Sequence, residues 1–176
     1  MIKSNEAIES LIKQLEQSNS SSVSQELINL APHSIPPLIK AYNQCLDQGV
    51  QAKLISILAK IGDDHALDLL VEIVGVDVAN HCQGNVRRVA ARGLGKMVTP
   101  KTSEPQRLKA IHKLIWALLN TEDWGLRYAA ALSLKEIAVK HPFASITTEI
   151  HKSLEGAIAQ ESDQVVQTRI KLLQTN

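Results

Sequence analysis

The chain has 176 residues and a formal net charge of +1, and 44% of it is hydrophobic but only 3% aromatic. Leu, Ile, Val and Ala must therefore fill the core, which is typical of packed amphipathic helices and argues against a β-sandwich. The balanced charge and the lack of a long Lys/Arg run argue against a nucleic-acid-binding protein.

Apolar residues recur at helical spacing along almost the whole chain. A stripe over 8–15 predicts a first helix, and a Ser-rich break separates it from a second helix over 23–30. The proline pair at 36–37 suits the first turn of a third helix, which we expect to run to Leu46. Gly, Asp, Asn and Pro separate the apolar stripes further along the chain. The helices predicted there run over about 50–61, 65–76, 85–98, 105–119, 125–139, 144–159 and 163–174.

One short pattern recurs at the start of several of these helices. It occupies 49–54, 85–90 and 125–130, with a weaker copy at 164–169, so that it returns about every 40 residues. A period of that length with two helices in each unit predicts a HEAT-type solenoid. We therefore expect an all-α fold of about five antiparallel helix pairs that form a right-handed curve.

The repeat pattern also predicts the domain organisation. We expect a single domain over 1–176, in which the best-matched repeats occupy 48–140. Residues 1–47 would form N-terminal helices, and 141–176 a C-terminal capping repeat. Terminal repeats of a solenoid differ from the inner ones because one of their faces meets solvent.

Two features inside the repeats have a structural interpretation. Arg87 and Arg127 occupy equivalent places at the start of second helices, where they are expected to pair with acidic turn residues such as Asp123 or to cap neighbouring carbonyls. Gly93 and Gly95 lie inside a helix, which favours close helix packing over a phosphate-binding loop.

The strongest chemical candidate is the pair His81 and Cys82. A thiol beside an imidazole is a plausible nucleophile and acid/base pair, and a following helix start would lower the thiol pKa further. The alternative is a cysteine that acts as a small buried hydrophobe beside a surface histidine. The connection over 77–85 is longer and more polar than the corresponding turn at 48–49, and such departures from regularity favour the functional interpretation.

The residues that follow this pair offer polar groups to a ligand. Gln83 and Asn85 carry side-chain amides, and Gly84 allows a ligand to approach the backbone closely. Asn85 has the simpler alternative role of an N-cap. A metal site is not expected, because adjacent His and Cys residues rarely reach one ion and no CxxC or HxxxH motif accompanies them.

Trp124, Arg127 and Tyr128 form a second candidate, an aromatic surface for a flat ligand. The alternative places Trp124 in the gap between two repeats, where its role is packing. Cys45 lies in an apolar context on the predicted third helix and is expected to belong to the core.

Segments 86–95 and 123–131 resemble the HEAT-like repeats of the E/F-type phycobiliprotein lyases of cyanobacteria. The hexapeptide 80–85 is similar to a motif associated with the F subunit of the phycoerythrocyanin alpha-subunit lyase-isomerase. The likeness is specific over about 66–140 and generic elsewhere.

The resemblance implies a heterodimer with an E-type subunit that serves phycobilisome assembly in photosynthesis. The pair would attach phycocyanobilin through a thioether to a cysteine of a phycobiliprotein alpha subunit and isomerise it to phycoviolobilin. The bilin is then a substrate, and no prosthetic group is expected.

The resemblance also implies roles for single residues. His81 and Cys82 would catalyse the isomerisation, with the imidazole moving a proton and the thiolate adding transiently to the tetrapyrrole. Arg87 or Arg88 would pair with the bilin propionates. Residues near them would complete the bilin site, namely Gln83, Asn85, Trp124 and Arg127.

Two other functions remain open at this stage. One is the F subunit of a phycocyanin lyase that attaches phycocyanobilin without isomerising it. The other is a non-catalytic HEAT adaptor for phycobiliprotein assembly or degradation. The sequence has neither a signal-peptide core nor a run long enough to span a membrane, so a cytoplasmic protein with reduced thiols is expected.

Overall fold

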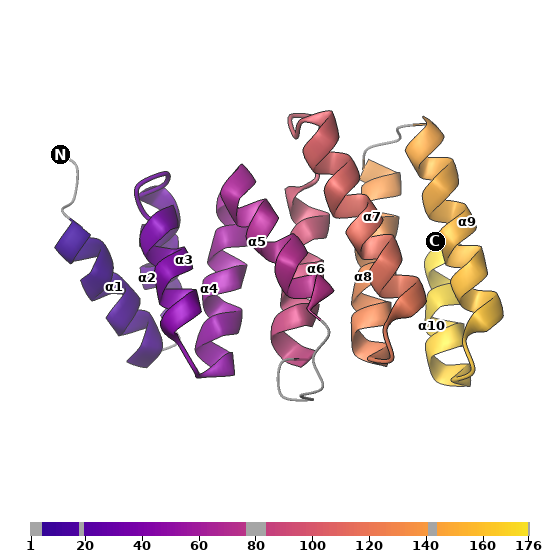
Figure 1. The fold of residues 1–176 in the computed structure, drawn as a ribbon, viewed down its shortest axis with the longest axis horizontal. Helices are drawn as coiled ribbons and strands as arrows, with labels where there is room; N and C mark the ends of the chain where they lie inside the picture. The colour runs from indigo at the N-terminus through magenta and orange to yellow at the C-terminus, as the bar shows by residue number, and fades with distance from the viewer. Residues whose placement is uncertain (1–4, 18–19, 77–83, 141–143, 176) are drawn as a thin grey trace.

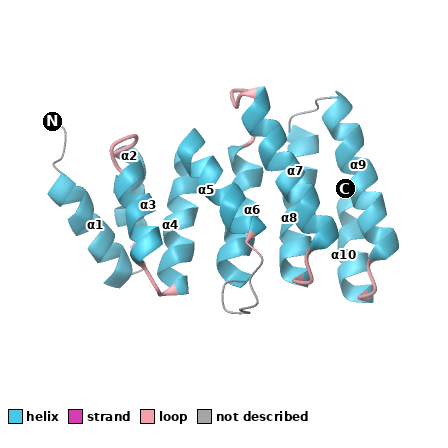
Figure 2. Cartoon of the chain, in the orientation of Figure 1, coloured by secondary structure: helices cyan, strands magenta, loops and turns pink. Residues whose placement is uncertain are grey.

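The computed structural model describes residues 5–17, 20–76, 84–140 and 144–175, and these form ten α-helices and no strand (Figure 1, Figure 2). Both the all-α class and the number of helices expected from the sequence are confirmed. The helices are α1 (Asn5–Gln17), α2 (Ser21–Asn29), α3 (Ile35–Gln44), α4 (Gln48–Ile61), α5 (Asp64–Gly75), α6 (Gly84–Met97), α7 (Glu104–Asn120), α8 (Trp124–Lys140), α9 (Ala144–Gln160) and α10 (Gln164–Thr175).

Successive helices run antiparallel and form five pairs in a row, as the repeat period predicts (Figure 1). The even-numbered helices form one layer, in which α4, α6, α8 and α10 pack in order. The odd-numbered helices form the other layer, in which α5, α7 and α9 pack in order. The packing of the odd layer is interrupted between α3 and α5, which contact each other far less than α5 and α7 do.

Aspartates start the helices at the positions where the chain turns. The Asp47 carboxylate accepts a hydrogen bond from the Val50 amide at 2.8 Å, and Asp163 accepts one from Val165 at 2.8 Å. Each satisfies a backbone donor that has no partner inside the helix. At the other end of α4, Gly62 has a φ of 74°, a left-handed conformation that glycine adopts without strain.

The third helix ends earlier than the sequence predicts. It stops at Gln44, and Cys45 follows in an extended conformation instead of lying on the helix. Asp47 must leave the helix to cap α4, so the chain turns before Leu46, whose side chain is 96% exposed. The expectation that Cys45 sits on an apolar helix is therefore wrong, although the residue still packs against the edge of the core.

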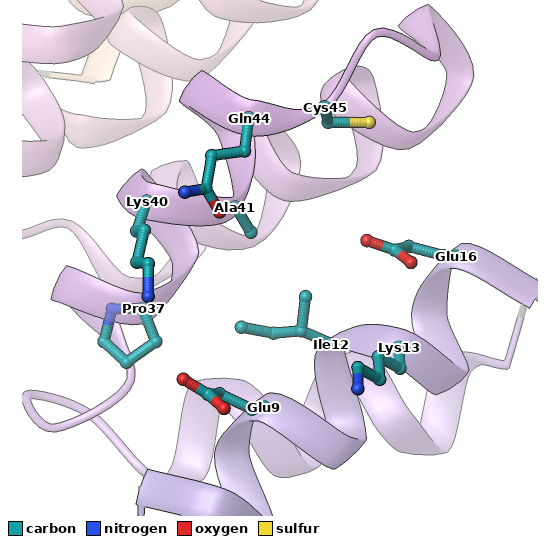
Figure 3. A pocket seen from close by; sticks show the side chains of 9 residues that line it. All are labelled: Glu9, Ile12, Lys13, Glu16, Pro37, Lys40, Ala41, Gln44 and Cys45. Carbon is teal, nitrogen blue, oxygen red and sulfur yellow. The ribbon is translucent and has the colours of Figure 1, made fainter.

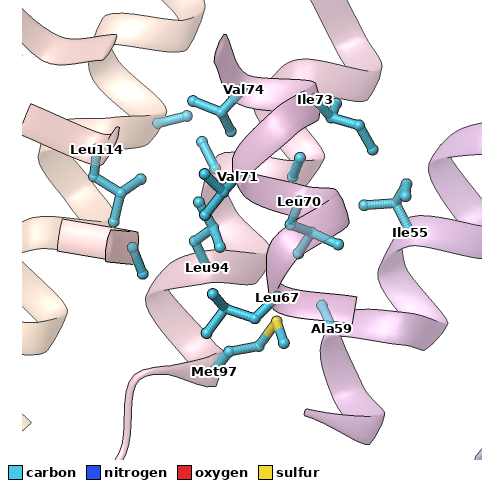
Figure 4. Packing of buried hydrophobic residues seen from close by; sticks show 14 of the residues in the cluster. Ile55, Ala59, Leu67, Leu70, Val71, Ile73, Val74, Leu94, Met97 and Leu114 are labelled. Atoms are coloured by element: carbon cyan, nitrogen blue, oxygen red, sulfur yellow. The ribbon is translucent and has the colours of Figure 1, made fainter. Parts of the chain in front are cut away.

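An apolar core runs between the two layers (Figure 4). Leu67 and Leu70 of α5 are buried in it, as is Leu94 of α6. Glycines let α6 approach its neighbours, because a Cβ on Gly93 would lie 2.6 Å from Leu70 Cδ2 and one on Gly95 would lie 2.6 Å from Ser133 Cβ. The prediction that these glycines serve close helix packing is confirmed.

Candidate functional site

The candidate site lies at one edge of the solenoid, which we call the turn edge. This edge carries the described turns inside three of the helix pairs, at 45–47, 121–123 and 161–163 (Figure 1, lower edge). The first residue of α6, Gly84, and the first residue of α8, Trp124, both lie there. The predicted catalytic residues His81 and Cys82, together with Gln83, lie outside the described residues.

An ion pair between Arg88 and Asp123 joins α6 to the start of α8. Arg88 Nη2 lies 2.7 Å from Asp123 Oδ1, and Arg88 Nε lies 3.3 Å from Asp123 Oδ2, so the contact is bidentate. The same carboxylate caps α8 by accepting hydrogen bonds from the amides of Gly125 at 2.9 Å and Leu126 at 3.2 Å. Asp123 therefore holds together the two helix starts that flank the site.

The pKa of Asp123 reflects these contacts. Burial by itself would raise the pKa of this carboxyl, but the hydrogen bond from Arg88, the amides of Leu126 and Gly125 and the guanidinium charge together lower it below its ordinary value. Asp123 is thus a carboxylate at neutral pH, and Arg88 remains paired with it.

The Arg88 guanidinium also lies over the Trp124 ring, 5.5 Å from its centroid. Two glycines leave room for this arrangement: a Cβ on Gly125 would collide with the guanidinium, and one on Gly84 would lie 3.1 Å from Asp123 Oδ2. Trp124 is 49% exposed, so it does not fill the gap between repeats, and the packing alternative for this residue is wrong. The Arg88 guanidinium covers one face of the Trp124 ring, and about half of the side chain remains exposed to solvent.

The other two predicted arginines are structural. Arg87 is buried and donates from Nη2 to the Val74 carbonyl at 3.0 Å, which ties α6 to the end of α5. Arg127 makes a bidentate pair with Glu161 at 2.8 and 3.0 Å and donates to the carbonyls of Thr121 and Glu122. The expected carbonyl capping is confirmed for both. The partner of Asp123, however, is Arg88 and not Arg87.

Two further predicted contacts differ from the structure. Asn85 is exposed in the first turn of α6, which begins at Gly84, so Asn85 is not the N-cap. Tyr128 takes its cation from Arg169 of α10, 5.8 Å from the ring centroid, whereas the Arg127 guanidinium is held by Glu161. The described part of the predicted site is therefore Asn85, Arg88 and Trp124.

A groove between α3 and α5, which sequence reasoning missed, reaches the same edge. It has a volume of about 710 Å³ and continues into a second hollow of about 630 Å³, sizes that suit a small organic ligand. Its wall is mixed: apolar side chains, among them Val76, the last described residue before the connection to α6, alternate with charged ones such as Asp68, Glu72 and Lys109. The groove exists because α3 and α5 hardly pack together, and only the tertiary structure reveals this. Its apolar lining includes Ile35, Ile39, Tyr42, Leu69, Ile73 and Val76.

Tyr42 supplies a polar group to this groove. Burial, together with the nearby carboxylate of Glu72, raises the pKa of the Tyr42 phenol above its ordinary value. The hydroxyl therefore stays protonated at neutral pH and can donate a hydrogen bond to a ligand carbonyl.

A separate hollow lies between α1 and α3, at the far end of the solenoid from α6 and α8 (Figure 3). Charged side chains surround it, including Glu9, Lys13 and Glu16, and Cys45 lies at its rim with a free thiol. The Cys45 thiol donates to the Asp47 carbonyl at 3.4 Å. Among the described residues, no three His, Cys, Asp or Glu side chains come together as metal ligands.

Comparison with known proteins identifies the family. The bilin biosynthesis protein PecF of Nostoc sp. strain PCC 7120 is 53% identical over 147 residues, which cover 84% of this chain and 80% of that protein. The chain belongs to the F-subunit family of E/F-type phycobiliprotein lyases. PecF of Mastigocladus laminosus is also 53% identical, over 145 residues that cover 82% of this chain and 65% of that protein, so the chain spans slightly less than two thirds of that relative.

A solved structure extends the likeness of this F-type chain to three dimensions. The complex of CpcE and CpcF of phycocyanin lyase from Nostoc sp. PCC7120 contains a chain that matches with a TM-score of 0.76 and 29% identity, over 97% of this chain and 99% of that one. The phycocyanobilin lyase subunit beta of Nostoc is 32% identical over 155 residues, which cover 86% of this chain and 74% of that protein. No family model matches the chain. None of the described helices combines the length and apolarity needed to cross a membrane.

Proposed function

We propose that the chain is the F subunit of a heterodimeric bilin lyase-isomerase. With an E-type subunit it attaches phycocyanobilin through a thioether to a cysteine of a phycobiliprotein alpha subunit and converts the bilin to phycoviolobilin. The observation that carries this proposal is the 53% identity to PecF over 147 residues. The bilin is the substrate, the subunit holds no prosthetic group, and it works in the cytoplasm.

The isomerisation requires proton transfer, which the His81–Cys82 pair is suited to perform. A double bond moves from the methine bridge beside ring A into ring A, so one carbon loses a proton and another gains one. His81 carries that proton, because an imidazole titrates near neutral pH. The Cys82 thiolate adds to the conjugated system and leaves again once the bond has moved, so the thiol is regenerated.

Two described features at the ends of the α5–α6 connection support bilin binding there. Val76, at the end of α5, lines the α3–α5 groove, and Gly84, at the start of α6, packs against Arg88 and Asp123. The chain between Val76 and Gly84 carries His81 and Cys82. A linear tetrapyrrole is a long, largely apolar molecule with two carboxylates, which suits an apolar groove and a partly exposed arginine.

Among the three arginines predicted for the bilin site, Arg88 is the one that a propionate can reach. Its side chain is 40% exposed, whereas Arg87 is buried and Arg127 is 19% exposed with several hydrogen bonds. Because Arg88 already binds Asp123, it offers a propionate only its remaining donors. Trp124 adds a flat aromatic face beside them, and Asn85 and Gln83 contribute amide groups to the same binding site.

The alternative with independent support is the F subunit of a lyase that attaches phycocyanobilin without isomerising it. The phycocyanobilin lyase subunit beta of Nostoc is 32% identical to this chain. The higher identity to PecF favours the isomerising enzyme. A non-catalytic adaptor would leave the bilin unattached, which the next experiment detects.

The test is co-expression with the E subunit, the phycobiliprotein alpha subunit and a source of phycocyanobilin. A blue-shifted attached chromophore is expected; a red-absorbing product means plain attachment, and an unmodified alpha subunit means an adaptor. Cys82→Ser and His81→Ala are expected to abolish the blue shift while leaving heterodimer formation intact. Cys45→Ser is the matched control, since Cys45 lies at the rim of the separate hollow between α1 and α3, and it should leave the product unchanged.

One outcome would contradict the catalytic role of Cys82 and would leave the fold assignment unaffected. If the Cys82→Ser variant gives the blue-shifted product at the normal rate, the thiol takes no part in the isomerisation. Full activity of the purified chain without an E subunit would contradict the heterodimer, because one short solenoid buries too little of a bilin by itself.

A further inference from the structure

The two layers of the solenoid carry opposite charge, although the net charge of the chain is only +1. The even-numbered helices hold eleven Lys and Arg side chains against two carboxylates, Glu26 and Glu136. The odd-numbered helices hold six Lys and Arg against nine Asp and Glu. These cations are spread over four separate helices, so the sequence contains no long basic run. The fold brings the four helices into one layer.

The cations and the exposed apolar side chains of the even layer share one outward surface. On α8, Trp124, Tyr128, Lys135 and Val139 recur at helical spacing and lie at least partly exposed. On α10 the corresponding stripe contains Val165, Arg169 and Leu172. On α6 it contains Arg88, Arg92 and Lys96. We call this surface the even face and define it by these ten residues.

The α8 stripe is apolar where a solvent-facing stripe is normally charged. Its inward side is buried in the core, and its outward side carries Trp124 at 49% and Val139 at 66% exposure, with Lys135 as the one charged residue of the stripe. Helices with apolar side chains all round are usually covered on every side. Val165 at 61% and Leu172 at 56% exposure continue the apolar surface onto α10.

On the even face, Arg88 and Arg92 pair with Asp123 and Glu136, but several other cations of this layer have no carboxylate partner among the described residues. Lys60, Lys96 and Lys140 stand in the last turns of α4, α6 and α8, where a cation stabilises the helix dipole. That local role does not account for Lys135 in mid-helix or for Arg169, and none of these five side chains makes an ion pair with a described residue. A basic surface with exposed apolar residues between the charges fits a protein interface better than a nucleic-acid groove, which is more uniformly polar.

We propose that the even face is the docking surface for an acidic protein surface, that of the phycobiliprotein alpha subunit that receives the bilin. This inference rests on the proposed function. The even face is continuous with the candidate site, because Arg88 and Trp124 belong to both. An acceptor bound there presents its cysteine at the turn edge, where a bilin in the candidate site would lie. Opposite charge steers the acceptor to this face, and the apolar residues of α8 and α10 provide the area that excludes water.

The test is a charge reversal on the even face in the intact heterodimer. Lys96→Glu, Lys135→Glu and Arg169→Glu are combined in one variant. Binding of the bilin-free alpha subunit is then measured at salt concentrations of about 0.05 and about 0.5 M. The variant should bind at least about tenfold more weakly at the lower salt concentration, and the difference from the wild type should shrink at the higher one.

The matched control reverses three at least partly exposed lysines of the odd layer that lie outside the α3–α5 groove, Lys13→Glu, Lys113→Glu and Lys152→Glu. It changes the net charge by the same amount and should bind the alpha subunit within about twofold of the wild type. Far-UV circular dichroism and size exclusion with the E subunit verify that both variants fold and form the heterodimer.

Each alternative result overturns the inference. Equal weakening by the two variants, or none by either, means that the even face does not bind the acceptor. Loss of the heterodimer in the even-face variant alone assigns the face to the E subunit. If the wild type binds a DNA duplex, the even-face variant alone loses that binding, and acceptor binding is unchanged, then the even face binds nucleic acid.

The same measurements separate this inference from the proposed function. If the wild-type heterodimer attaches no bilin but its binding to the alpha subunit depends on the even face, the enzyme assignment fails and the docking surface stands. If bilin attachment proceeds normally in the even-face variant with unchanged acceptor binding, the docking surface fails and the enzyme assignment stands.

Discussion

Replacing Gly95 by alanine tests how closely α6 and α8 pack. The new Cβ would lie 2.6 Å from Ser133 Cβ and 3.0 Å from its Cα, well inside an ordinary carbon–carbon contact of about 3.5–4 Å. Ser133 cannot turn away freely, since its hydroxyl donates to the Ala91 carbonyl at 3.0 Å and accepts from Arg92 at 3.0 Å. The backbones of α6 and α8 must therefore separate.

The expected cost follows from two opposing effects. Overpacking a tight core costs about 1–3 kcal/mol, and the higher helix propensity of alanine returns about 1 kcal/mol. Gly95→Ala should therefore lower the free energy of unfolding by about 0–2 kcal/mol. Gly156→Ala in α9 is the matched control, because nothing lies within 4 Å of its new Cβ, and it should raise the free energy of unfolding by about 0.5–1 kcal/mol.

The assay is urea unfolding of both variants, followed by far-UV circular dichroism. Thermal melts should agree, since 1 kcal/mol shifts the Tm of a chain of this size by about 2–4 °C. If Gly95→Ala and Gly156→Ala stabilise the protein to a similar degree, α6 and α8 do not approach each other as the structure shows, and the close-packing explanation of the glycine is refuted.

Two further predictions concern the charged contacts at the turn edge. Asp123→Asn should lower the free energy of unfolding by about 0.5–1 kcal/mol near neutral pH, since the pair with Arg88 is partly exposed. The contacts of Asp123 lower its pKa in the folded state, so this loss should be fully present above about pH 4 and should disappear as the pH falls through the pKa of Asp123 in the folded protein. Urea unfolding at several pH values measures the loss. A loss that persists in acid would contradict the prediction. Glu161→Gln should cost more, about 2–3 kcal/mol, because it leaves Arg127, at 19% exposure, without its carboxylate. Asp68→Asn, in an ion pair that is about half exposed, is the control and should cost at most about 0.5 kcal/mol by the same assay; equal costs would refute the difference in burial.

The helices themselves could be predicted from local sequence because their signals are local. Apolar spacing and aspartates before helix starts depend on residues within one or two turns, so most predicted boundaries lie within about two residues of those observed. At the end of the third helix, the observed boundary lies two residues before the predicted one. The requirement that Asp47 cap α4 outweighed the apolar pattern through Leu46 and placed Cys45 outside the helix.

The partners of the arginines could not be predicted in the same way. Repeat alignment matched Arg87 with Arg127, and both do cap carbonyls at the end of the preceding helix, which is the other helix of the same pair. The alignment gave no means of assigning Asp123 to Arg88, because that choice depends on how far each helix is rotated and on the space left by Gly84 and Gly125. For the same lack of information, the sequence left two roles open for Trp124, part of a ligand surface or packing between repeats.

Sequence by itself determined the class of fold, the repeat and the family, because each is carried by a pattern of neighbouring residues. Tertiary structure decided which surfaces exist. The α3–α5 groove depends on how far apart two helices pack, and the even face depends on which layer each helix joins. A net charge of +1 is a sum over the chain, and it conceals eleven cations that only the alternation of helices between two layers gathers in one layer.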